Sequence, residues 1–117
     1  MDTPQAVSLF EILASGARLD IFRLLVRHNP HGLVAGEIAR ELHIAPTNLS
    51  FHLKSMTYNG LLHVTQEGRY QRYRAALGRI EELIRYLTEA CCAAHPEQYC
   101  PILTATPLEQ HPKGTSS

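Results

Sequence analysis

A three-residue connection, His43-Ile44-Ala45, separates two short stretches that have the apolar spacing of helices. The first covers residues 34–42. The second begins at Pro46, which suits the first turn of a helix because its missing N–H has no partner there. It ends near Tyr58, because the glycine of Asn59-Gly60 can adopt the left-handed cap conformation. Helix, short turn and helix in this order predict a helix-turn-helix unit.

A pattern typical of a β-hairpin follows directly. Residues 61–66 are expected to form a strand, Glu67-Gly68 a tight turn, and residues 69–74, in which Tyr and Arg alternate, a returning strand. Residues 47–74 carry four basic side chains and one acidic one, a net charge of +3. The sequence therefore predicts a mainly α fold with a small basic β-hairpin, which is the order of a winged helix-turn-helix.

Three further stretches have helical spacing of apolar residues, and the last of them has a continuous stripe. That stripe is typical of core packing, but it is also what a dimer seam needs. We expect residues 1–94 to form one DNA-binding and dimerisation domain. Residues 101–117, which hold Pro107, Pro112, Gly114 and Ser116-Ser117, are expected to be a disordered tail. The three predicted helices cover residues 5–14, 17–28 and 77–92.

Short polar side chains at the start of the second helix of the unit suit contacts to base edges in the DNA major groove. Basic residues farther along and on the hairpin suit contacts to phosphates, which fix position without reading sequence. Leu49, Leu53 and Met56 are expected to face inward. The alternative interpretations are a simply solvated helix face, a structural role for His52, and an ordinary strand position for His63. The predicted DNA-binding residues are Thr47, Asn48, Ser50, His52, Lys54, Arg69 and Arg72.

The composition excludes some classes of protein. The formal net charge is zero, but local charge governs affinity for nucleic acid better than the total does. No stretch approaches the ~20 apolar residues of a membrane span, and the first residues lack the layout of a secretory signal. These observations predict a cytoplasmic protein, where thiols stay reduced and clustered cysteines indicate metal or redox chemistry.

All three cysteines of the chain, Cys91, Cys92 and Cys100, lie within ten residues. Three thiolates without a bound water suit trivalent arsenic or antimony, because thiolates select soft ions and the lone pair of the ion takes the fourth direction. Neighbouring residues point ~100° apart on an intact helix, so sharing one ion requires the helix to fray. The segment 91–100 is the predicted metalloid site. The alternatives are a Cys₃His zinc site with His95, a thiol-redox sensor and cysteines that bind nothing.

Several short motifs together resemble the ArsR/SmtB repressors over residues 7–92. They are Arg18-Leu19-Asp20-Ile21-Phe22, Gly36-Glu37-Ile38-Ala39, Asn48-Leu49-Ser50-Phe51-His52-Leu53-Lys54 and Gly60-Leu61-Leu62. The resemblance implies a homodimer joined mainly through its first and last helices. It also implies a repressor that binds operator DNA and releases it when an inducing metal or metalloid binds.

Two usual sensor sites of that family are missing from the matching positions. Residues 33–38 contain no cysteine pair, and residues 80–87 contain no histidine. The remaining pattern is similar to a subgroup that places its thiols at the end of the last helix, with As(III), and possibly Sb(III), as the inducer. We expect no organic cofactor. We do not expect an enzyme, since the chain has no glycine-rich strand–helix turn and its thiols follow a helix. A DNA-binding protein without a small ligand is the other alternative.

Overall fold

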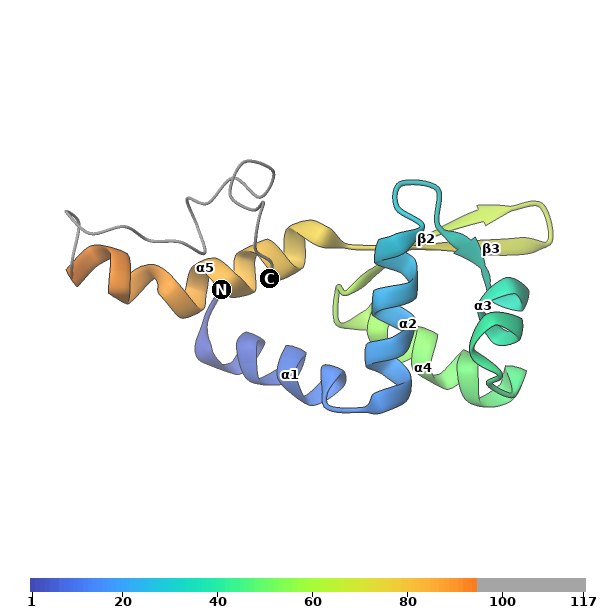
Figure 1. The fold of residues 1–117 in the computed structure, drawn as a ribbon, viewed down its shortest axis with the longest axis horizontal. Helices are drawn as coiled ribbons and strands as arrows, with labels where there is room; N and C mark the ends of the chain where they lie inside the picture. The colour runs from blue at the N-terminus through green and yellow to red at the C-terminus, as the bar shows by residue number, and fades with distance from the viewer. Residues whose placement is uncertain (95–117) are drawn as a thin grey trace, which may run out of the picture. The chain divides into compact units, whose positions relative to one another are not determined.

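Five helices and three strands follow one another along residues 1–94, the part of the chain that the computed structural model describes, with side chains as far as Glu89. The arrangement is the predicted winged helix-turn-helix (Figure 1). The elements are α1 (Thr3–Leu13), α2 (Gly16–Arg27), β1 (Leu33–Val34), α3 (Ala35–Leu42), α4 (Pro46–Tyr58), β2 (Leu62–Glu67), β3 (Tyr70–Ala75) and α5 (Leu77–Ala94).

Side chains fix where the first two helices begin. Asp2 Oδ1 accepts a hydrogen bond from the Gln5 N–H at 3.0 Å, and Gln5 Oε1 accepts one from the Asp2 N–H at 2.9 Å. This reciprocal capping box satisfies backbone donors that have no partner inside α1. Ser15 caps α2 through a single hydrogen bond, because its Oγ accepts from the Arg18 N–H at 3.3 Å. The short Ala14-Ser15 connection therefore separates two well-defined helices.

The core of residues 1–80 is built from the apolar faces of the helices and the start of β2. Leu49, Leu53 and Met56 are at most 2% exposed, which confirms that this side of α4 faces inward. α3 packs against both α2 and α4, so the helix-turn-helix unit is supported from behind. Other fully buried side chains are those of Leu9, Ile21, Leu24, Leu25, Ile38 and Leu61.

The β-sheet has one more strand than the sequence predicted. β3 lies between β2 and the two-residue strand β1, and both pairings are antiparallel. Leu33 and Val64 are both partners of Tyr73, one on each side of it. Residue 34, expected to begin a helix, ends this strand instead, and α3 begins at Ala35. β2, β3 and their turn, residues 62–75, form the wing, which extends beyond the helices in Figure 1.

The chain divides into two units, one ending at Ile80 and the other beginning at Glu81. α5 continues through the second unit, where Thr88 Oγ1 donates a hydrogen bond to the Ile84 carbonyl at 2.9 Å. No helix in the described residues combines the length and hydrophobicity needed to span a membrane. Cys100 and the predicted tail, 101–117, lie outside the described residues. One functional domain over residues 1–94 stays a prediction.

Candidate nucleic-acid interface

α4 presents a polar outer face opposite its buried leucines. Thr47, Asn48, Ser50 and Lys54, four of the predicted DNA-binding residues, are all exposed. Pro46 occupies the first turn of the helix, as expected. Three of the four follow Pro46 within the first turn and a half, so short donors and acceptors gather at the end of the helix that enters a major groove in proteins of this fold.

His52 is placed differently from these four residues. Its ring is half-buried, and its Nδ1 lies 3.3 Å from Nη1 of Arg18 on α2. The guanidinium of Arg18 also donates through Nε to the Ile12 carbonyl at 2.6 Å. A guanidinium has only donors, so a hydrogen bond between these two atoms requires Nδ1 to accept and the ring proton to lie on Nε2. The arrangement favours a structural role for His52, which was the alternative to DNA binding. A DNA contact by this residue stays a prediction.

The two predicted arginines of the wing differ in how they are held. Arg69 is exposed beside the turn at Gly68, whose φ is +61°. Arg72 Nε lies 2.9 Å from Glu67 Oε2, and its Nη1 donates to the Gly32 carbonyl at 3.3 Å. The Glu67 charge partly neutralises Arg72, while the described contacts leave Arg69 turned to solvent. Both remain candidates for phosphate contacts, with Arg69 the more accessible.

A groove of about 340 Å³ separates α4 from the wing. It brings two predicted DNA-binding residues, Ser50 and Lys54, together with wing residues that sequence reasoning did not single out. Tyr73 is one of its lining residues: it is 9% exposed, and its hydroxyl donates to Gln71 Oε1 at 3.0 Å. Burial raises the pKa of Tyr73 above its ordinary value of 10.0. The groove is lined by Ser50, Lys54, Thr57, Tyr58, Val64, Gln71 and Tyr73.

Sequence reasoning missed two exposed aromatic residues on the outer face of α4. Phe51 is 70% exposed and Tyr58 is 89% exposed. The helical spacing could have located both, because Phe51 follows the buried Leu49 by two residues and therefore lies about 200° away around the helix axis. Because only polar side chains were considered in residues 47–54, Phe51 was not predicted as a site residue.

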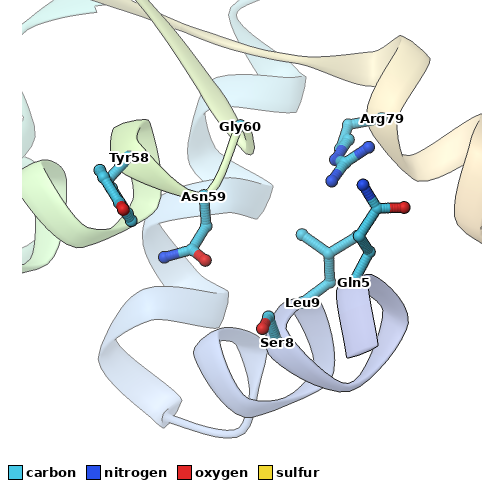
Figure 2. Close-up of a pocket in the computed structure, with 7 residues that line it drawn as sticks. All are labelled: Gln5, Ser8, Leu9, Tyr58, Asn59, Gly60 and Arg79. Carbon is cyan, nitrogen blue, oxygen red and sulfur yellow. The ribbon is translucent and has the colours of Figure 1, made fainter. Parts of the chain in front are cut away.

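A second pocket, of about 600 Å³, lies where the end of α4 meets α1 and the first turn of α5. Figure 2 shows the Gln5 and Arg79 side chains extending toward one another on one side of it, with Asn59 and Tyr58 on the other side. None of the predicted site residues lines this pocket. Its lining residues are Gln5, Ser8, Leu9, Tyr58, Asn59, Gly60 and Arg79.

The side chains of the predicted metalloid site all lie outside the described ones. Cys91 and Cys92 belong to the helical backbone of α5, which ends at Ala94, and Cys100 is outside the described residues. Within the described part of the chain, no three His, Cys, Asp or Glu side chains are grouped so that they could hold a metal ion. The three-cysteine site stays a prediction.

Known proteins resemble the chain in sequence and in structure. The family described as a helix-turn-helix domain matches residues 13–65, from the end of α1 into β2. No curated protein sequence matches the chain. An ArsR-like transcriptional regulator from Rhodococcus sp. RHA1 shares the fold, with a TM-score of 0.68, 22% identity, and coverage of 80% of this chain and 86% of that one.

Two other solved structures are more similar in sequence. The transcriptional regulator HlyU from Vibrio vulnificus CMCP6 is 28% identical, with a TM-score of 0.58 over 76% of this chain and 90% of that one. A homodimeric winged helix-turn-helix DNA-binding domain from Mycobacterium bovis, part of a possible ArsR-family regulator, is 27% identical, with a TM-score of 0.59 over 74% and 80% of the two chains. In fold and in sequence, the chain is thus similar to DNA-binding winged helix-turn-helix transcription regulators of the ArsR type.

Proposed function

We propose that the chain is a homodimeric repressor that binds operator DNA and releases it when trivalent arsenic or antimony binds Cys91, Cys92 and Cys100. The observation that carries the DNA-binding part is the exposed polar face of α4 beside a basic wing. Thr47, Asn48 and Ser50 offer hydrogen bonds to base edges. Lys54 and Arg69 offer charge to phosphates.

The homodimer is supported by exposed apolar surface on two helices. On α1, Val7 and Phe10 are 46% and 47% exposed and lie three residues apart, so they share a face. On α5, Leu87 is 56% exposed. Covering such residues in a second copy removes apolar surface from water. The related domain from Mycobacterium bovis is itself homodimeric. Sedimentation analysis tests the proposal, and a monomer at micromolar concentration would contradict it.

The inducer part rests on the chemistry of the three thiols and on the position of two of them, Cys91 and Cys92, in the last turn of α5. An intact helix turns Cys91 and Cys92 about 100° apart. Capture of one ion by three sulfurs therefore requires the end of α5 to unwind, and α5 is one of the two proposed dimer helices. Binding would then change the dimer, and with it the spacing of the two α4 helices. Coupling of this kind typically weakens DNA binding about 5–150-fold.

The decisive experiment titrates arsenite against the protein bound to a fluorescent operator duplex, selected beforehand from random sequences. Arsenite is expected to release the DNA. Replacing each cysteine by serine in turn should leave the affinity without arsenite unchanged and abolish the release. Full-strength DNA binding at saturating arsenite would refute the inducer, and loss of DNA binding in the serine variants would make the cysteines structural.

A thiol-redox response of the same fold is the second candidate function. One observation favours it: a relative, HlyU from Vibrio cholerae, 26% identical, has been solved in a form described as reduced. Release of DNA by hydrogen peroxide, reversed by a thiol reductant and absent with arsenite, would select this alternative. Release by Zn²⁺ that also depends on His95 would select the zinc site.

A further inference from the structure

The centre of the outer face of α4 is apolar, although its neighbours are polar. Phe51 is 70% exposed, while Leu49 and Leu53 on either side of it in sequence are 2% exposed. Thr47 lies one turn before Phe51 and Lys54 one turn after it, so the three side chains are neighbours on one face. A single exposed apolar residue is ordinary on a protein surface. Its position between two predicted DNA-binding residues is the feature that calls for an explanation.

We propose that Phe51 reads thymine, by packing its ring against the C5-methyl group in the major groove. The proposal rests on the proposed DNA binding through α4 and adds a base preference to it. Phe51 is the sixth residue of α4, within the N-terminal half that approaches base edges. A phenyl ring offers no hydrogen bond to a phosphate or to a polar base edge, and the thymine methyl is the apolar group on the groove floor.

The placement of His52 strengthens this assignment. Its ring is half-buried and its Nδ1 contacts Arg18, so the next residue along the helix does not share the outer face with Phe51. The exposed ring of Phe51 is thus flanked by Thr47 and Asn48, one turn earlier. Asn can pair bidentately with adenine. An Asn and a Phe one turn apart therefore favour half-sites in which neighbouring A·T pairs place an adenine and a thymine methyl in the major groove.

The experiment changes one methyl group at a time. An operator is selected from random duplexes with the wild-type protein, and each thymine in a half-site is then replaced by uracil, which lacks only the C5-methyl. Dissociation constants are measured by fluorescence anisotropy at one fixed salt concentration. At one or two positions the wild-type protein should bind the uracil duplex about fourfold more weakly, which corresponds to roughly 0.8 kcal/mol.

The Phe51→Ala variant should bind the thymine duplex at least fourfold more weakly and should no longer distinguish thymine from uracil at those positions. Phe51→Leu keeps an apolar contact and should retain part of the discrimination. Val26→Ala, which shortens an exposed apolar side chain on α2, is the matched control and should discriminate as the wild type does. Because Phe51 is exposed, its variants should unfold at the wild-type temperature.

The outcomes separate this proposal from the proposed function. If no duplex is selected, DNA binding itself is refuted. If an operator is selected but Phe51→Ala still distinguishes thymine from uracil, the reading of thymine by Phe51 is overturned while the repressor stands. If Phe51→Ala changes the sedimentation coefficient and leaves thymine discrimination intact, the residue is a protein contact and the proposal is again overturned.

Discussion

Arg18 on α2 and His52 on α4 are 34 residues apart in sequence, yet their side chains meet with Nη1 3.3 Å from Nδ1. Arg18 is also fixed to the Ile12 carbonyl at the end of α1. The pair therefore links the start of the chain to the middle of the helix proposed to enter DNA. We infer that His52 positions α4 through Arg18 rather than contacting a base.

Two substitutions of His52 separate these roles. Asn places an acceptor near the position of Nδ1, whereas Gln places its amide near that of Nε2. We expect His52→Asn to keep wild-type stability and DNA affinity. His52→Gln should lose the hydrogen bond, at about 1 kcal/mol, and unfold about 4–8 °C lower. Thermal unfolding and anisotropy measure both effects. A Gln variant that behaves as wild type, beside an impaired Asn variant, would show that Nε2 contacts the DNA.

Lys54→Ala should weaken binding to all duplexes alike, because a phosphate contact carries no sequence information. The slope of log K against log salt concentration should fall by about 0.9, the value for one phosphate on duplex DNA. Titrations at several salt concentrations give this slope. Lys54→Arg should restore it, and Arg23→Ala, an exposed charge on α2, should leave it unchanged. A loss confined to one duplex sequence would instead make Lys54 a base reader.

The helical pattern of α4 could be predicted from its sequence because Leu49, Leu53 and Met56 follow one another at helical spacing over about two turns. The same spacing also indicates which other residues of α4 are exposed, and the polarity of the residues does not. His52 precedes the buried Met56 by one turn and so lies beside the buried face, whereas Phe51 lies opposite Leu49. Angular position on the helix, rather than polar character, separated the exposed residues from the half-buried one.

Other features could not be predicted from the sequence. Two residues, Leu33 and Val34, are too few to show the alternation of a strand, and β1 exists because β3 offers them a free edge. The Arg18–His52 contact and the groove between α4 and the wing depend on how distant segments pack. Local periodicity carries no information about either.

Gly32 lies in the loop before β1, and two other glycines provide the comparisons that measure how strained a side chain would be there. Gly32 has φ +73°, and a Cβ there would collide with the Tyr73 carbonyl oxygen. Gly68 has φ +61° but open space around it, and Gly78 has neither constraint. We expect Gly32→Ala to destabilise the fold by more than about 2 kcal/mol and Gly68→Ala by about 1 kcal/mol, the usual penalty of a left-handed residue.

Gly78→Ala is the control of this series and should be neutral or stabilising by up to about 1 kcal/mol, since Ala suits a helix better than Gly. Urea unfolding of the three variants gives the differences. Equal destabilisation by Gly32→Ala and Gly68→Ala would mean that the close approach to Tyr73 adds nothing to the backbone penalty.

Because the Tyr73 hydroxyl is buried, we expect the fold to lose stability in alkaline solution. Burial raises its pKa in the folded state above the ordinary value of 10.0, so between these two values the unfolded chain binds fewer protons than the folded one. The contribution of the Tyr73 hydroxyl to the free energy of unfolding is fully present below pH 10. It is lost as pH rises through the folded-state pKa. Tyr73→Phe should remove that part of the alkaline loss. It should also lose the hydrogen bond to Gln71, which lowers the free energy of unfolding by about 0.5–1.5 kcal/mol in neutral solution.

Urea unfolding of both proteins from pH 8 to 11 yields the difference. The control is Tyr70→Phe, at a 64% exposed tyrosine of the same strand. Parallel stability curves for wild type and Tyr73→Phe above pH 10 would contradict the prediction, because the buried hydroxyl would then titrate as it does in the unfolded chain.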